Sequence, residues 1–136
     1  MTEKITPAMQ AFWANDPAPI KMGVELIEAR DGRSELRLHL QDHHLNGHRT
    51  AHGGVVHLLA DCAAGFAANS TGEQAVTQTN TITFVSPGRV GDTLTATGTF
   101  LARSGRSALF DVVVAADDGR KVAVMRAQMR YISAKS

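Results

Sequence analysis

Hydrophobic and polar residues alternate in two short segments near the N-terminus and then give way to one long apolar segment. Residues 24–29 and 34–40 have the pattern of strands, and the turn signal Asp31-Gly32 joins them. Residues 53–69 are rich in alanine and leucine, lack proline, and carry apolar residues on nearly every side. This pattern predicts a helix that is buried on most faces, with enough small residues to let a sheet wrap closely around it.

After Gly72 the pattern changes to period two. Strands are expected at residues 76–84, 92–102, 107–116 and 121–132. Breaks at Ser86-Pro87-Gly88 and Asp117-Asp118-Gly119 separate them, and such short turns predict antiparallel neighbours. The chain is therefore expected to be a single α+β domain over residues 1–136, with one antiparallel sheet curled around one buried helix.

The N-terminal region carries a weaker signal. Residues 4–14 have the composition of a short helix, which Pro7 is expected to interrupt early. The sequence Asn15-Asp16-Pro17 then indicates that the helix stops.

Composition narrows the class of protein. A chain of 136 residues with 43% hydrophobic residues, 20% charged residues and a net charge of +1 is typical of one soluble domain, and it favours neither nucleic acid nor a membrane surface as a partner. The single cysteine, Cys62, excludes an internal disulfide and a cysteine zinc site, and we expect it to be a small core residue. No apolar run reaches the roughly 18 residues of a membrane span, and the first 20 residues lack the apolar centre of a signal peptide, so the expected location is the cytoplasm.

The candidate chemistry lies where the long helix begins. His52-Gly53-Gly54 precedes the helix, and the helix itself holds one acidic residue, Asp61. Paired glycines let the backbone approach a ligand closely, and a helix N-terminus offers unpaired N–H groups that suit a developing oxyanion. A carboxylate in an apolar helix is costly unless it has a partner or a task. Asp61 could instead cap a loop or pair with an arginine, but together these features indicate part of a catalytic site.

Several short motifs combine with this element order. They are Asn46-Gly47, His52-Gly53-Gly54, Leu59-Ala60-Asp61, Asn69-Ser70, Phe84-Val85-Ser86-Pro87 and Gly91-Asp92-Thr93-Leu94-Thr95-Ala96. Together they resemble the hotdog-fold superfamily and, more closely, the PaaI-type acyl-CoA thioesterases of phenylacetate degradation. The resemblance implies a hotdog fold, in which a curled antiparallel sheet wraps around one long central helix.

The resemblance also implies the reaction, which is hydrolysis of a thioester of coenzyme A. The Gly53 N–H is expected to bind the thioester oxygen, and Asp61 to act as general base on water or as a nucleophile. Asn46 is expected to hydrogen-bond the water or the thioester carbonyl, although Asn46-Gly47 is also an ordinary turn signal. No metal or other cofactor is expected, because a thiolate is a good leaving group and coenzyme A is part of the substrate.

The separation of Gly53 and Asp61 along the helix predicts that two subunits share each active site. Gly53 and Asp61 are eight residues apart, which places them about 12 Å apart along a helix. A reacting carbonyl must lie roughly 3 Å from both its oxyanion donor and its base or nucleophile. We therefore expect Asp61 of one subunit to work with the Gly53 loop of another. The resemblance implies the same homodimer, and PaaI-type members commonly assemble into homotetramers.

The remaining candidates would bind the substrate. His52 is expected to shape the loop by bonding backbone groups, with Gly54 beside it, and Thr77 to lie near the catalytic water, although it could be an ordinary strand threonine. Three turn arginines are candidates for the coenzyme A phosphates, unless they are simply solvated: Arg89, Arg103 and Arg106. The acyl pocket is expected to be lined by helix residues near Asp61 and by Val56, Leu59 or Phe66. Small residues at Ala63, Ala64 and Gly65 are expected to leave room for an aryl group.

Other functions stay open. The same fold could serve a non-catalytic acyl-CoA binding or sensing protein, although binding alone does not require a desolvated carboxylate. A hotdog dehydratase is a third hypothesis, but such enzymes typically use a histidine with an acid in a different local motif. The chain has six histidines, yet His48 and His52 are placed in a loop and no well-spaced carboxylate completes a metal site.

Overall fold

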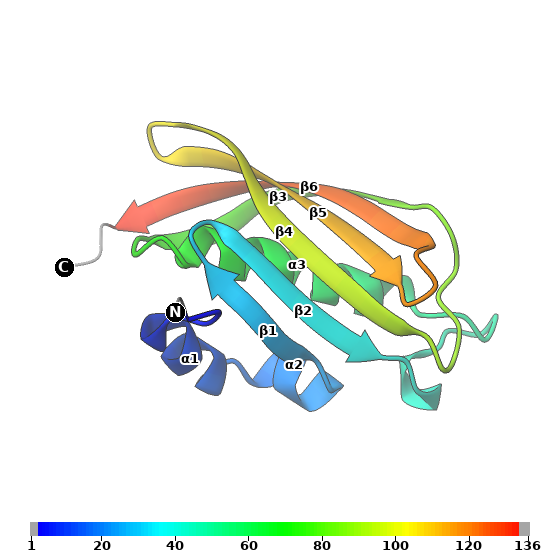
Figure 1. Cartoon of the computed structure of the whole chain (residues 1–136). Helices are drawn as coiled ribbons and strands as arrows, with labels where there is room; N and C mark the ends of the chain where they lie inside the picture. The colour runs from blue at the N-terminus through cyan, green and yellow to red at the C-terminus, as the bar shows by residue number, and fades with distance from the viewer. Residues whose placement is uncertain (1–2, 134–136) are drawn as a thin grey trace.

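The computed structural model describes residues 3–133. Within this range six strands form one antiparallel sheet in the order β1-β2-β4-β5-β6-β3, and the sheet curls over the long helix α3 (Figure 1). In chain order the elements are α1 (Pro7–Ala14), α2 (Pro17–Met22), β1 (Glu25–Arg30), β2 (Arg33–His39), the 3-10 helix Asp42–His44, α3 (Gly53–Asn69), β3 (Gln74–Phe84), β4 (Thr93–Ser104), β5 (Ser107–Ala116) and β6 (Lys121–Ser133).

The central helix α3 has the bounds that the sequence predicts, and it packs tightly against the sheet. Nine of its residues are buried: Val55, Val56, Leu59, Ala60, Ala63, Ala64, Phe66, Ala67 and Ala68. The helix touches β4 so closely that a Cβ atom on Gly98 would lie 2.6 Å from the Ala63 carbonyl oxygen. The buried Ser34 hydroxyl donates to the same oxygen at 2.5 Å. The small residues predicted to allow close wrapping therefore do so.

The first hairpin also follows its prediction. Asp31 and Gly32 both have positive φ angles, 53° and 80°, as a tight hairpin turn between twisted strands requires. The register pairs Arg30 with Arg33 directly across this turn.

The connection between β3 and β4 differs from the prediction that short turns join neighbours. β3 pairs with β6 at the edge of the sheet, whereas β4 lies between β2 and β5. Residues 85–92 form a loop long enough to cross from the edge to the middle of the sheet, so β5 and β6 fill the positions between. This arrangement leaves β3 as an edge strand beside α3.

The N-terminal region holds two helices rather than one. Pro7 begins α1 instead of interrupting it, because proline suits the first helical position and the Thr6 hydroxyl oxygen caps the helix by accepting from the Met9 N–H. The predicted stop after Ala14 is correct, but Pro17 then starts α2, which the sequence reading missed. The Phe12 and Trp13 rings pack on Phe66 of α3, with centroids 5.2 and 5.6 Å away.

Among residues 3–133, no helix has both the length and the apolar character needed to cross a membrane.

Candidate active site

Asp61 lies on the strip of α3 that the sheet does not cover. Its Oδ1 atom accepts two hydrogen bonds from β3, one from the Thr77 hydroxyl at 3.0 Å and one from Asn80 Nδ2 at 2.9 Å. The hydrogen bonds found within residues 3–133 all reach Oδ1 and leave Oδ2 without one. The carboxylate is thus held by one oxygen, and the other remains available for chemistry.

A β-bulge places both partners of Asp61 on one face of β3. Thr77 and Asn80 are three positions apart, so a regular strand would direct them to opposite faces. The pairing of β3 with β6 shifts register between Thr77 and Thr79, and the extra residue restores the common face. Asn80 Nδ2 also lies 2.9 Å from His57 Nε2, which links a second helix residue to the group. Asn80 was not among the residues predicted for the site, and its one signal in the sequence is the run of polar residues at 77–81.

Gly53 is the first residue of α3. The preceding His52 caps the helix, because its Nδ1 accepts from the Gly54 N–H at 2.9 Å. The Gly54 N–H is therefore occupied, whereas the Gly53 N–H has no hydrogen-bond acceptor within the described residues. A free N–H at the positive end of a helix is the kind of donor that stabilises a developing oxyanion.

Asn46 organises the loop before the helix. Its Oδ1 accepts from the backbone N–H groups of His48 and Thr50, at 2.9 and 3.1 Å, and from the Thr50 hydroxyl at 3.3 Å. The side-chain oxygen thus serves the turn, and among residues 3–133 the Nδ2 group has no acceptor, so it is left as a donor. Asn46 and Gly53 line the same cavity of about 370 Å³, together with Val56 and Phe84.

Asp61 lines a different cavity, of about 300 Å³. Its walls come from the N-terminal helices, α3, β3 and β6: Phe12, Asp16, Ala18, Pro19, Leu58, Cys62, Gly65, Phe66, Asn69, Ala75, Thr77 and Met129. We call this the Asp61 cavity. Asp61 also lines an open hollow of about 390 Å³ with Gly54, His57, Leu58, Thr77 and Asn80. In a single chain, Asn46 and Gly53 line neither of the two.

The residues expected to line the acyl pocket are only partly those found around Asp61. Gly65 and Phe66 do line this cavity. Leu59 does not line it, because it is fully buried on the side of α3 that packs against the sheet. Ala63 and Ala64 are buried on the same side, so they leave no room in this cavity. Val56 lines the cavity at Gly53 instead. The missed wall comes from the N-terminal helices, which the sequence did not place beside Asp61.

Two more titratable groups share the Asp61 cavity. Burial, and then the charge of Asp61, raise the pKa of the Asp16 carboxyl above its ordinary value. Burial, followed by the charges of Asp16 and Asp61, raises the pKa of the Cys62 thiol to about 12. Cys62 is partly buried and stays a neutral thiol at physiological pH, which makes it a poor nucleophile.

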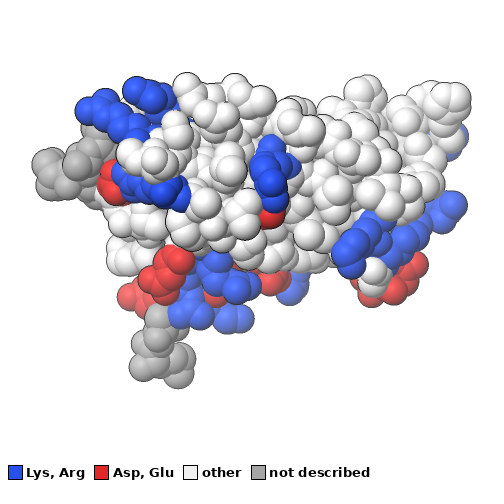
Figure 2. Space-filling model, turned by 90° about the horizontal axis from the view of Figure 1, so that it is seen from above, with Lys and Arg blue, Asp and Glu red and all other residues white. Residues whose placement is uncertain are grey.

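The three arginines considered for coenzyme A do not gather in one chain. Arg103 forms a double ion pair with Glu73, at 2.8 and 3.0 Å, and lies 3.9 Å from the centre of the Tyr131 ring. Arg103 and Arg106 flank the β4–β5 turn, whereas Arg89 belongs to loop 85–92 at the other end of the sheet (Figure 1). Figure 2 shows lysine and arginine side chains toward the two ends of the outer face and along its lower edge, with a further cationic side chain in the otherwise largely uncharged middle. Within residues 3–133, no three His, Cys, Asp or Glu side chains are grouped as metal ligands.

Comparison with known proteins gives the class. The model of the thioesterase superfamily matches residues 48–123, more than half of the chain, and the chain belongs to this superfamily. The protein is thus a thioester hydrolase. It is similar to the acyl-coenzyme A thioesterase PaaI of Escherichia coli (strain K12), with 32% identity over 97% of this chain and 94% of that protein.

Solved structures of thioesterases are similar to this chain in fold. The E. coli PaaI protein from the phenylacetic acid degradation operon matches with a TM-score of 0.89 and 32% identity, covering 93% of this chain and 91% of that one. A hypothetical thioesterase of Streptococcus pneumoniae TIGR4, solved with coenzyme A, matches with a TM-score of 0.80 and 26% identity, covering 83% and 91%. The hotdog fold and the resemblance to PaaI-type thioesterases are therefore confirmed.

Two further structures of the S. pneumoniae protein are single alanine variants. One replaces an aspartate and the other replaces a threonine 16 positions further along the chain. Asp61 and Thr77 have the same separation here, and they are joined by a hydrogen bond.

Proposed function

We propose that this protein hydrolyses acyl-CoA thioesters to a free acid and coenzyme A, with Asp61 as the reacting carboxylate. The observation that carries the proposal is the state of Asp61 on the uncovered strip of α3: Thr77 and Asn80 hold Oδ1, and Oδ2 is left without a hydrogen bond among residues 3–133. Support for the substrate comes from the E. coli relative, an acyl-coenzyme A thioesterase, and from the S. pneumoniae thioesterase solved with coenzyme A.

Two chemical routes use the same groups. As general base, Asp61 takes a proton from water while the water oxygen bonds to the thioester carbon. The C–S bond then breaks, and the leaving thiolate of coenzyme A recovers the proton. As nucleophile, Asp61 bonds to the same carbon, expels the thiolate and forms an anhydride that water opens. In both routes the Gly53 N–H stabilises the negative charge on the carbonyl oxygen, and Asn46 Nδ2 donates to that oxygen or to the water.

Each site is proposed to combine two copies of the chain. Asp61 and the Gly53 loop line separate cavities in one copy, and about 12 Å of helix divides them. The edge strand β3 and the uncovered strip of α3 lie side by side, which gives a second copy a continuous surface on which to bind. A homodimer joined there would bring Asp61 of one copy to Gly53 and Asn46 of the other. Further pairing into a homotetramer is part of the same proposal.

The acyl group is proposed to be phenylacetyl, hydroxyphenylacetyl or a related group of moderate size. Phe12 and Phe66 form an aromatic wall of the Asp61 cavity, and an aryl group packs well against such a wall. The arginines Arg89, Arg103 and Arg106 are candidates to reach the coenzyme A phosphates, from one copy or from both.

The test is release of free thiol from a panel of acyl-CoA thioesters by the wild-type protein and by Asp61→Ala. The panel contains phenylacetyl, hydroxyphenylacetyl, benzoyl, short straight-chain and long straight-chain thioesters. Release that prefers aryl groups and disappears in Asp61→Ala supports the proposal. Binding of acyl-CoA without release from any thioester would overturn it in favour of a binding or sensing protein, and hydration or dehydration of the acyl chain would point to a dehydratase.

A further inference from the structure

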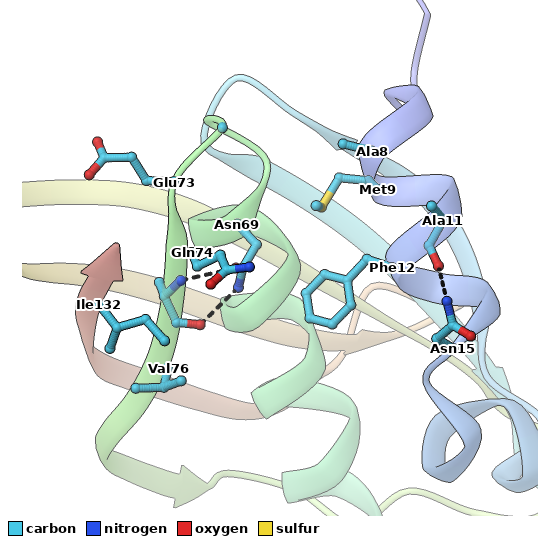
Figure 3. A pocket seen from close by; sticks show the side chains of 12 residues that line it. Ala8, Met9, Ala11, Phe12, Asn15, Asn69, Glu73, Gln74, Val76 and Ile132 are labelled. Carbon is cyan, nitrogen blue, oxygen red and sulfur yellow. Dashed lines mark hydrogen bonds between the residues drawn. The ribbon is translucent and has the colours of Figure 1, made fainter. Parts of the chain in front are cut away.

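A second cavity adjoins the one that holds Asp61. It has a volume of about 470 Å³, lies between α1 and the start of β3, and has Ala8, Met9, Val76 and Ile132 among its apolar wall residues (Figure 3). It is larger than the Asp61 cavity of about 300 Å³. The active-site chemistry described above makes no use of it.

Three residues are common to the walls of both cavities: Phe12, Asn69 and Ala75. Asn69 and Ala75 are fixed to each other, because the Asn69 amide donates to the Ala75 carbonyl at 3.1 Å and its oxygen accepts from the Ala75 N–H at 3.0 Å. Asn69 also donates to the Gly65 carbonyl at 2.8 Å. These two residues therefore form a rigid part of the boundary.

Phe12 is the adjustable part of the boundary. Its ring extends from α1 toward the end of α3, between the α1 residues and the β-strand residues of the second cavity (Figure 3). The ring packs on Phe66, yet 42% of the residue remains exposed. It has no polar atom to satisfy, so truncating it removes a wall without leaving a broken hydrogen bond.

We propose that Phe12 sets the length of the acyl group that the enzyme accepts. The ring stands in the walls of both cavities, so an acyl group that fills the Asp61 cavity must pass the ring to reach the second one. Once the ring is removed, the occupant of that second cavity is the distal part of a straight alkyl chain, since apolar residues of α1, β3 and β6 form most of its wall. The polar part of the wall consists of Asn15, Asn69, Glu73 and Gln74. This inference rests on the proposed acyl-CoA thioesterase function.

The experiment compares kcat/KM for phenylacetyl-CoA, octanoyl-CoA and dodecanoyl-CoA in the wild type, Phe12→Ala, Phe12→Leu and Phe12→Tyr. Each buried methylene group is worth about fourfold. Phe12→Ala should therefore raise the ratio of dodecanoyl-CoA to phenylacetyl-CoA activity by about tenfold or more, and Phe12→Leu by less. Phe12→Tyr keeps the ring and should keep the wild-type ratio.

Phe100→Ala is the matched control. Phe100 is 52% exposed and packs on a buried phenylalanine, Phe110, at 5.7 Å, but it lines neither cavity. Its loss should leave the ratio unchanged. An equal fall of all three activities in Phe12→Ala, with no change in the ratio, would overturn the inference and leave Phe12 as a packing residue. If Phe12→Ala does not fold, an unchanged ratio in Phe12→Leu overturns it equally.

A failure of the proposed thioesterase function can be distinguished from a failure of the proposed role of Phe12. A wild-type protein that releases thiol from no acyl-CoA contradicts the thioesterase proposal and not the role of Phe12. The same variants are then compared by calorimetric Kd for dodecanoyl-CoA and phenylacetyl-CoA. Relatively tighter dodecanoyl-CoA binding by Phe12→Ala supports the length-setting role, and an unchanged ratio of Kd values contradicts it.

Discussion

Thr77 donates its hydroxyl hydrogen to Asp61 Oδ1 over 3.0 Å, from the edge strand of the sheet to the central helix. Asn80, on the same strand, donates to the same oxygen at 2.9 Å. Two donors on one oxygen fix the orientation of the carboxylate. Reactivity is thus confined to Oδ2, the atom that the proposed mechanism uses.

Replacing Asp61 tests that assignment directly. We expect Asp61→Ala and Asp61→Asn to lower kcat by about 10²–10⁴-fold, the usual contribution of a general base, with little effect on the fold. Thiol release and circular dichroism, measured on the same preparations, would show this. A folded Asp61→Ala protein with wild-type turnover would contradict the mechanism.

We expect Thr77 to affect activity by orienting the Asp61 carboxylate through its hydroxyl group. Two variants distinguish the effect of losing this hydrogen bond from the effect of changing the side-chain shape. Thr77→Val keeps the shape and loses the donor, and we expect kcat to fall about tenfold or more, because a hydrogen bond to a charged group is worth about 1.5–3 kcal/mol. Thr77→Ser retains the donor and should keep most of the activity. Equal activity of the serine and valine variants would show that the hydrogen bond to Asp61 is not needed.

Much of the fold could be predicted from the sequence because each signal is local. The bounds of α3 follow from a long, mostly apolar segment without proline. Asp31-Gly32 marks the β1–β2 hairpin because both residues of its turn adopt positive φ. The order of the strands could be predicted less well. The position of β3 at the edge depends on where loop 85–92 leads, and no local signal fixes that path.

The residues of the candidate site could likewise be predicted where the signal is local, and not where it depends on tertiary packing. Asp61 and Gly53 stand out because a lone acid and paired glycines are unusual in an apolar helix. Asn80 could not be placed, because its contact with Asp61 depends on a β-bulge that shifts which face of β3 it occupies. Asp16 was visible only as part of a helix stop, and its place in the Asp61 cavity requires the packing of the N-terminal helices on α3.

The stability of the protein should depend on Asp16 and pH. Burial, and then the charge of Asp61, raise the pKa of Asp16 in the folded state, so the charged form is disfavoured there relative to the unfolded chain. The resulting destabilisation is present above the raised folded pKa and disappears as the pH falls below 3.8, the ordinary pKa of an aspartate in the unfolded chain. We expect Asp16→Asn to raise the Tm at pH 7 and to lose this advantage near pH 3.

Asp61→Asn provides the control for the pH experiment. It removes the charge that contributes to the raised pKa of Asp16, so part of the stabilisation by Asp16→Asn should vanish in the double variant. Thermal unfolding of the four proteins at pH 7 and at pH 3 gives the comparison. An Asp16→Asn protein that is less stable than the wild type at pH 7 would show that the carboxylate has a favourable partner in the assembled protein.

The proposed sharing of each site between two copies can be tested with mixed dimers. Gly53→Pro removes the N–H donor, and proline is well suited to the first position of a helix, so α3 should still form. Neither Asp61→Ala nor Gly53→Pro should be active alone. A heterodimer of the two would hold one site with both parts intact, and we expect thiol release to recover to about half of the wild-type rate per dimer.

A second heterodimer makes this test decisive, because it reverses the expectation. A chain that carries both Asp61→Ala and Gly53→Pro, paired with a wild-type chain, leaves no intact site if sites are shared, but leaves one if each chain works alone. Two different affinity tags, one on each chain, allow both heterodimers to be purified and assayed under the same conditions. Activity in the Asp61→Ala with Gly53→Pro pair, and its absence in the wild type with double-variant pair, would establish shared sites. The opposite result would place a complete site within one chain and would require α3 to bend between Gly53 and Asp61.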